Sequence, residues 1–147
     1  MAHRRASRRS RVGGDRHRPR PGPLPPSAAE HAIDLVTVDR DDEAGVEQLV
    51  GDGVDLLVDA LGYAPSQAEH LARLPRRCGG TAYLSAKAVY VDPCGHHLNS
   101  PGGAHFTAPV PESTPTMAWA GHEVRSREGY GAGKAESERV LRGTASA

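Results

Sequence analysis

Tyr130 and Lys134 are the residues whose types and spacing point most directly to chemistry. They enclose the sequence Tyr-Gly-Ala-Gly-Lys, and a polar stretch follows as far as Leu141. If this segment is helical, residues four apart lie on one face. A phenol has an ordinary pKa of about 10, and a nearby ammonium favours the phenolate, so the pair can exchange a proton near neutral pH. The alternative is a surface tyrosine and a surface lysine on a polar helix, because Tyr-x-x-x-Lys is a weak pattern.

Short apolar stretches upstream are predicted to form the sheet that positions this pair. Residues 33–38, 54–60 and 81–86 are apolar and bounded by turn residues, which is typical of buried strands. Between them, residues 43–50 and 65–74 carry apolar side chains at helical spacing. Strands alternating with helices through short connections predict an α/β fold with a parallel sheet.

The order of these elements resembles a known family. Together with Ser-Ala-Lys-Ala-Val-Tyr at residues 85–90 and Gly-Tyr-Gly-Ala-x-Lys at residues 129–134, it resembles the extended short-chain dehydrogenase/reductase family. These proteins are NAD(P)-dependent epimerases, dehydratases and reductases of nucleotide sugars and related compounds. The resemblance runs from about Ile33 to Leu141. It implies a partial Rossmann-like domain over residues 31–147, hydride transfer at a secondary alcohol or ketone, NAD or NADP as cofactor, a nucleotide sugar or related carbonyl compound as substrate, and a cytoplasmic location.

The resemblance assigns a role to each catalytic candidate. Tyr130 matches the general acid/base, and Lys134 matches the lysine that holds the nicotinamide ribose and lowers the pKa of the tyrosine. A hydroxyl at the end of the preceding strand should bond the substrate oxygen. The matching position here is Ala86, and the nearest hydroxyl is Ser85, one residue earlier. Adjacent strand side chains point to opposite faces, and losing such a donor costs roughly 10²–10³ in rate.

The glycine-rich turn that holds the pyrophosphate in this family is missing from the sequence. The family begins with a strand, a Gly-x-x-Gly-x-x-Gly turn and a helix. The glycines near the start of this chain, Gly13, Gly14 and Gly22, lie among arginines and prolines. The family's C-terminal substrate lobe also has no counterpart after the Tyr130 helix. We therefore expect a domain truncated at both ends, either impaired as an enzyme or a non-catalytic remnant or interaction module.

Five residues match peripheral parts of the dinucleotide site. Asp39 and Arg40 match positions that contact the adenine, and Ala60, Leu61 and Gly62 match the turn that lines the cofactor after the next strand. Each has an ordinary structural alternative. Asp39 belongs to a sequence that offers a helix N-cap, and Gly62 is typical of a turn.

Residues 1–30 differ in composition from the rest of the chain. They contain eight arginines against two carboxylates, a net charge of +6, while the remaining 117 residues balance it with −6. With five prolines after residue 18 and few large apolar side chains, this segment is predicted to be disordered. Four alternatives remain for this segment: a solvated tail, a basic arm that binds phosphates, a targeting peptide, or an artefact of a wrong start site or a frameshift. Nucleic acid is the less favoured partner, because no aromatic side chain alternates with the arginines.

The segment from Val91 to Arg127 is rich in proline and shows little periodicity. We interpret it as a flap over the site, anchored by Phe106 and Trp119. Within it the sequence Cys94-Gly-His-His97 could supply metal ligands, with Cys78 or His105 as a fourth. Its spacing fits no standard zinc pattern, so no metal site is predicted.

Two cysteines do not make a disulfide framework, and no apolar run approaches the length of about 20 residues that spans a membrane.

The predicted strands correspond to the third, fourth and fifth strands of a doubly wound sheet. The first and second strands, which lie between the third and the fourth in such a sheet, have no counterpart in this sequence. Residues 33–38 are therefore predicted to pair with residues 54–60. Such a small sheet would expose its edges, which favours self-association.

Overall fold

A computed structural model of the protein describes residues 36–74, 78–107 and 109–145. The chain divides into two compact units, Met1–Gly51 and Asp52–Ala147. The predicted disordered tail, residues 1–30, and the first three residues of the predicted strand 33–38 lie outside the described part.

The described part of the first unit contains helix α2, Glu43–Val50, at the bounds predicted from the sequence. The carboxylate of Asp42 caps its start, because Oδ1 accepts a hydrogen bond of 3.1 Å from the backbone N–H of Gly45. Gly51 ends the helix with a φ of 59°, a conformation that favours glycine.

The strand predicted at residues 33–38 is wrong for residues 36–38, which have no regular secondary structure. The sheet of the described residues contains β1 and β2 only, so the predicted pairing of this segment with residues 54–60 is not observed there. Apolar, β-branched composition identifies a segment suited to a strand, but a strand also requires a hydrogen-bonded neighbour.

The second unit contains the two parallel strands β1, Leu57–Asp59, and β2, Thr81–Tyr83. Val58 pairs with Ala82, and an isolated bridge between Val54 and Cys78 continues the pairing upstream. The α/β class and the parallel sheet predicted from the sequence are thus confirmed. Both strands are shorter than the predicted 54–60 and 81–86.

Helix α3, Pro65–Arg73, connects the two strands. Proline suits the first turn because its missing N–H would have had no helical partner. The side chain of Gln67 accepts the N–H groups of Tyr63 at 2.8 Å and Ala64 at 3.2 Å, which fixes the entry to the helix. Its buried face carries Ala68 and Leu71, two of the residues predicted for it.

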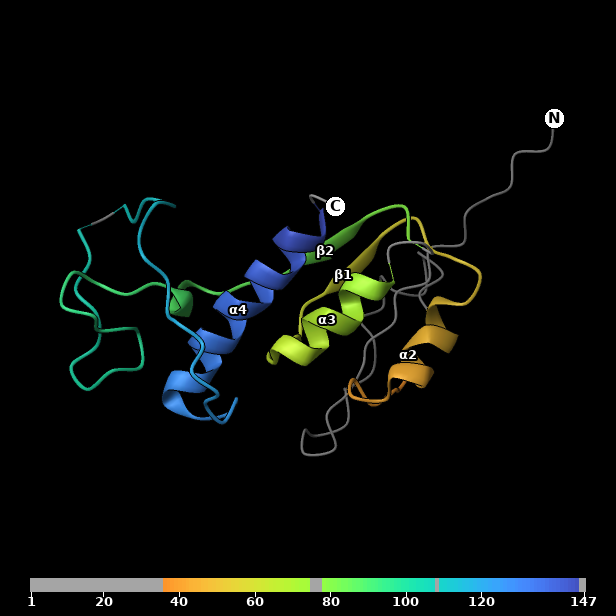
Figure 1. The fold of residues 1–147 in the computed structure, drawn as a ribbon, viewed down its shortest axis with the longest axis horizontal. Coiled ribbons are helices and arrows are strands. Elements are labelled where there is room, and N and C mark those ends of the chain that lie inside the picture. Colours follow the sequence, from red (N-terminus) through yellow and green to blue (C-terminus); the bar gives the residue numbers. More distant parts are fainter. Residues whose placement is uncertain (1–35, 75–77, 108, 146–147) are drawn as a thin grey trace, which may run out of the picture. The chain divides into compact units, whose positions relative to one another are not determined.

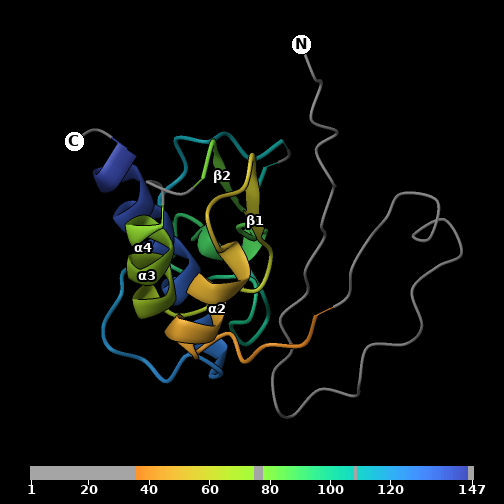
Figure 2. The ribbon, with the colours of Figure 1, turned by 90° about the vertical axis from the view of Figure 1, so that its right-hand side faces the viewer.

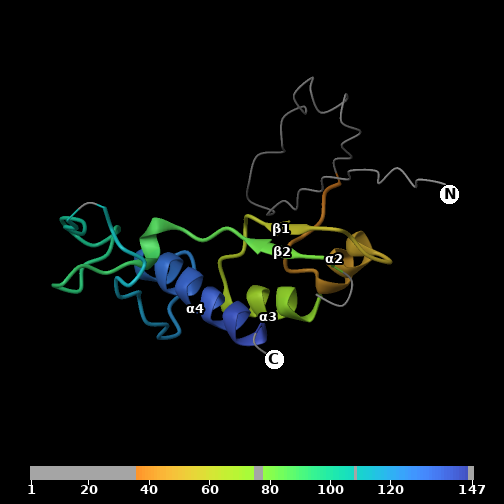
Figure 3. The same ribbon diagram turned by 90° about the horizontal axis from the view of Figure 1, so that it is seen from above.

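Helix α4, Arg127–Ala145, is the longest element of the described part and packs along α3. Figure 1 and Figure 3 show the two helices side by side on one side of the β1–β2 sheet, and Figure 2 shows the same layers from the end. The hydroxyl of Ser126 accepts the N–H of Gly129 at 2.9 Å and so caps the start of α4. The carboxyl end of β2 leads into the short 3₁₀ helix η2, Lys87–Val89, which also contacts α4.

The described residues between η2 and α4 form a long loop with isolated bridges, such as the one between Tyr90 and Thr116, but no helix or strand. Trp119 lies against α4, since its Cζ3 atom is 3.7 Å from the place that a Cβ on Gly133 would occupy. Trp119 is thus an anchor to the body, as predicted. In the described part of the chain, no helix combines the length and the apolar character needed to cross a membrane.

Candidate active site at the ends of the two strands

Tyr130 and Lys134 project from the same face of α4 toward Tyr63, which follows the carboxyl end of β1. The ring centroids of Tyr63 and Tyr130 are 5.7 Å apart, with an angle of 49° between the ring planes. The ammonium of Lys134 lies 5.3 Å from the centroid of Tyr63. We call Asp59, Tyr63, Tyr83, Tyr130 and Lys134 the strand-end cluster, because all five gather at the carboxyl ends of the parallel strands.

Lys134 is buried, with 2 % of its surface exposed. Its Nζ donates a hydrogen bond of 2.6 Å to the carbonyl oxygen of Leu84, the residue directly after β2. Burial lowers the pKa of Lys134, while the carboxylates of Asp59 and Glu138 act in the opposite direction. The ammonium therefore lies at the carboxyl tip of β2, where the resemblance expects a functional lysine, but it is enclosed by protein.

Tyr83 closes the other side of the ammonium, with its ring centroid 4.6 Å from Lys134 Nζ. Its hydroxyl donates a hydrogen bond of 2.9 Å to the carbonyl oxygen of Gly62. Burial raises the pKa of Tyr83 to about 12, and the negative charges of Asp59 and Glu138 act in the same direction. Tyr83 is thus held as a neutral phenol at the end of β2.

Asp59 organises the turn that was predicted to line the cofactor. Its Oδ1 accepts the N–H groups of Leu61 at 3.0 Å and Gly62 at 2.9 Å. Gly62 is required here because a Cβ would lie 2.8 Å from Cε2 of Tyr83 and 2.9 Å from Oδ2 of Asp59. In the turn formed by the predicted cofactor residues Ala60, Leu61 and Gly62, the N–H groups of Leu61 and Gly62 therefore already have an acceptor.

Ser85 lies two residues after β2, and its hydroxyl donates a hydrogen bond to Oε1 of Glu138 on α4. The other oxygen of Glu138 accepts a hydrogen bond of 3.1 Å from Arg142. Ala86, the position that the resemblance would give to a catalytic hydroxyl, is the residue before η2. The available hydroxyl is thus held by an intramolecular acceptor, Glu138, which lies one helical turn after Lys134.

Asp39 and Arg40, the predicted adenine contacts, belong to the first unit, whereas the strand-end cluster is formed within the second. The carboxylate of Asp39 accepts the N–H of Asp41 at 3.1 Å, and its carbonyl oxygen accepts the N–H of Asp42. Asp39 therefore orders the turn before α2, and the cap itself is Asp42.

Three of the residues considered as metal ligands, Cys94, His96 and His105, lie around a buried aspartate. Within the described ranges, no group of three or more histidine, cysteine, aspartate or glutamate side chains is arranged to hold a metal ion. Instead Asp92, which is 6 % exposed, accepts backbone N–H groups from Cys94 at 2.9 Å, His96 at 2.8 Å and His105 at 3.0 Å. These bonds lower the pKa of Asp92, the bond from His105 most strongly.

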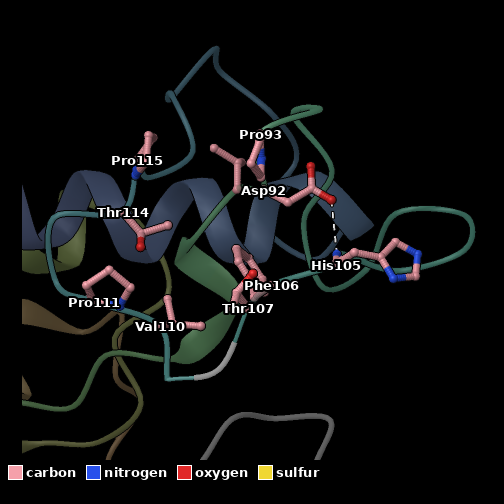
Figure 4. A pocket seen from close by; sticks show the side chains of 10 residues that line it. Asp92, Pro93, His105, Phe106, Thr107, Val110, Pro111, Thr114 and Pro115 are labelled. Atoms are coloured by element: carbon pink, nitrogen blue, oxygen red, sulfur yellow. Dashed lines mark hydrogen bonds between the residues drawn. The ribbon is translucent and has the colours of Figure 1, made fainter.

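A pocket of about 430 Å³ lies in the same loop and not at the strand-end cluster (Figure 4). Its walls are mostly apolar and include Phe106, Val110 and Pro115, with Asp92 and His105 at one side. Phe106 therefore packs within the loop, unlike Trp119, which lies against α4.

Replacing Asp92 with alanine is expected to loosen the loop, because three backbone N–H groups lose their acceptor. Hydrogen exchange at the N–H groups of Cys94, His96 and His105 should accelerate by about tenfold or more. Because the pKa of Asp92 is lower in the folded state than its ordinary value of 3.8, its contribution is fully present above that value. The contribution should be lost as the pH falls through the lower, folded pKa. Glu112→Gln changes an exposed acid of the same loop and serves as the control. Unchanged exchange in Asp92→Ala would contradict this role.

Sequence reasoning missed three members of the cluster, Asp59, Tyr63 and Tyr83, as well as Glu138. A signal for Glu138 was present, because Tyr130, Lys134 and Glu138 follow one another at intervals of four residues. The two tyrosines could have been found by asking which side chains surround the carboxyl ends of the predicted strands.

No protein-family model, no curated protein and no solved structure gives a significant match to this chain.

Proposed function

We propose that the chain carries an NAD(P)-dependent epimerase/dehydratase/reductase-like site that acts on a secondary alcohol or its ketone. One observation carries the proposal: Tyr130 and Lys134 converge on Tyr63 beside the carboxyl end of a parallel strand. Ligands of open α/β sheets bind at the carboxyl ends of the strands, so this is where a reacting group would be held.

In this proposal Tyr130 moves the proton. Its hydroxyl gives a proton to the substrate oxygen in reduction and takes it back in oxidation. The positive charge of Lys134, on the same face of α4, favours the negative charge that develops on the oxygen atoms. Ser85 is the candidate donor to the substrate oxygen, and it can fill that role only when its hydrogen bond to Glu138 is broken.

The described residues fit the nicotinamide-ribose end of a dinucleotide better than its pyrophosphate. NAD or NADP, when bound, supplies the nicotinamide C4 that accepts or gives the hydride. Lys134 uses one N–H for the Leu84 carbonyl, and an ammonium has three, so two N–H groups remain for ribose hydroxyls when the side chain of Tyr63 turns aside. The N–H groups of Leu61 and Gly62 face the carboxylate of Asp59, which would repel a phosphate. The proposal therefore implies weak dinucleotide binding, and a nucleotide sugar or related carbonyl compound is the substrate class that the resemblance suggests.

Titration with NADH and NADPH tests the proposal, and Trp119 provides the signal. It is the single tryptophan of the chain and lies against α4 near Gly133, so energy transfer from it to a bound reduced nicotinamide is measurable. We expect saturable quenching with a dissociation constant in the millimolar range. Lys134→Met should weaken binding at least about tenfold, which corresponds to about 1.4 kcal/mol.

Lys87 offers a matched control, because it is the other lysine of the chain and is exposed in η2. Lys87→Met should bind NADH as the unmodified protein does. Absence of saturable quenching at millimolar NADH and NADPH, or equal affinity in Lys134→Met, would refute the proposal.

A non-catalytic interaction module is the second candidate, favoured by one feature of the sheet. Leu56, Val58 and Leu84 are 59 %, 53 % and 48 % exposed, which is unusual for large apolar side chains in and beside strands. In the described sheet, each of the two strands also has one edge without a strand partner. Concentration-dependent association in sedimentation velocity, without NADH binding, would favour this second function.

A further inference from the structure

The ammonium of Lys134 is enclosed by two aromatic rings that the resemblance does not account for. Tyr63 and Tyr83 come from different elements, the turn after β1 and the end of β2, and their centroids lie 5.3 Å and 4.6 Å from Nζ. The carbonyl oxygen of Leu84 completes the enclosure at 2.6 Å. Separations below about 6 Å are those at which the face of a ring attracts a cation.

The ring of Tyr83 and the backbone of Tyr63 are held in place by their own contacts. The Tyr83 hydroxyl is bound to the carbonyl of Gly62, and β2 sets the direction of its side chain. The N–H of Tyr63 is bound to Gln67, and its carbonyl oxygen lies so close to α4 that a Cβ on Gly133 would overlap it. Moving the Tyr83 ring breaks its bond to Gly62, and the backbone of Tyr63 cannot shift without disturbing the start of α3 or the packing of α4.

Burial of an ammonium with a single hydrogen bond needs compensation, because the charged form loses its hydration. The carboxylates of Asp59 on β1 and Glu138 on α4 supply part of it, as their effect on the pKa of Lys134 shows. The two ring faces are the remaining favourable contacts of the ammonium with the described residues around it.

We infer that Tyr63 and Tyr83 form an aromatic cage that keeps the buried Lys134 protonated and holds its ammonium on the side of α4 where Tyr130 lies. They are positioning residues, since they act through Lys134 and Tyr130, and Tyr63 contacts both. This inference rests on the proposed function for its catalytic meaning, but the cage itself is a property of the free protein.

Lysine-selective ¹³C labelling tests the cage directly. The chain contains two lysines, so the spectrum holds two Hε–Cε signals, and Lys87→Arg assigns them. Protons above the face of an aromatic ring resonate upfield, so the Hε protons of Lys134 should lie upfield of those of the exposed Lys87. Equal positions of the two signals in the unmodified protein would overturn the inference, whether or not any variant folds.

The pH titration of the same signals measures the effect of each ring. Tyr63→Leu removes a ring face from the ammonium and should lower the pKa of Lys134 further, by about 0.5–1 pH unit. Tyr63→Phe keeps the ring and should leave this pKa within about 0.2 unit, so it is the matched control. Tyr83→Leu and Tyr83→Phe repeat the comparison on the second ring. A leucine variant that titrates like its phenylalanine counterpart would overturn the inference.

The cage and the proposed function can be refuted independently of each other. If NADH does not bind while Lys134 shows the upfield position and the response to Tyr63→Leu, the cage stands and the hydride-transfer function is refuted. If NADH binds through Lys134 but neither ring affects its signal, the cage is refuted and the function stands.

Discussion

Replacing Gly133 with alanine is expected to destabilise the protein by about 1–3 kcal/mol, although alanine is the better helix former. A Cβ at this position would lie well inside 3.0 Å of the Tyr63 carbonyl oxygen, closer than real Cβ contacts come. The obstacle is backbone, so no flexible side chain can turn away to relieve it. Gly131→Ala should have a similar effect, because its Cβ would overlap the carbonyl oxygen of Ala88. Urea denaturation followed by Trp119 fluorescence measures both changes.

Gly143 is the matched control in the same helix. It is exposed, and nothing lies within 4 Å of the place that its Cβ would occupy. Gly143→Ala should therefore stabilise the protein, by up to about 1 kcal/mol. If Gly133→Ala and Gly143→Ala change stability in the same direction, α4 does not pack against the turn at Tyr63 as described.

Lys134→Ala is expected to destabilise the protein by about 2–5 kcal/mol, because it creates a cavity and leaves the Leu84 carbonyl without its donor. Lys134→Met fills most of the same volume and removes the cost of burying a charge. Its effect on stability should stay within about 1.5 kcal/mol. Both variants should bind dinucleotide at least about tenfold more weakly, since neither has an ammonium. Thermal denaturation measures the first property, and NADH titration the second.

The comparison of Lys134→Ala with Lys134→Met separates the packing contribution of the side chain from the contribution of its charge. Lys87→Met should leave stability and NADH binding unchanged, because Lys87 is exposed. A large loss of stability in Lys134→Met would show that the charge itself holds the strand-end cluster together. Retained NADH binding in the same variant would remove Lys134 from the proposed site.

The helices were predictable because local signals define them. Residues 43–50 have a capping aspartate before them and a glycine after them, and Pro65 marks the first turn of α3; both helices form there. The strands were less predictable, because a strand depends on its partner. Regular strand pairing covers Leu57–Asp59 and Thr81–Tyr83, with one isolated bridge upstream, and after the strands side chains bind the next backbone groups. Asp59 accepts the next N–H groups on one strand, and Lys134 donates to the carbonyl of Leu84 on the other.

The candidate site was predictable only in its helical part. Spacing places Tyr130 and Lys134 on one face of α4, and both do approach Tyr63. Sequence spacing does not say which side chains from other elements surround that face, so the burial of Lys134 between Tyr63 and Tyr83 was not foreseen. The bond between Ser85 and Glu138 joins residues 53 positions apart, and only the fold brings them together.

The central claim is that Lys134 belongs to a dinucleotide site, and its own ¹³C signal tests this most directly. NADH and NADPH are added stepwise to protein labelled at lysine, with the signal of the exposed Lys87 as the internal reference. The proposed function predicts that the Lys134 signal moves saturably while the Lys87 signal stays in place. A Lys134 signal that does not move at millimolar NADH and NADPH would contradict it.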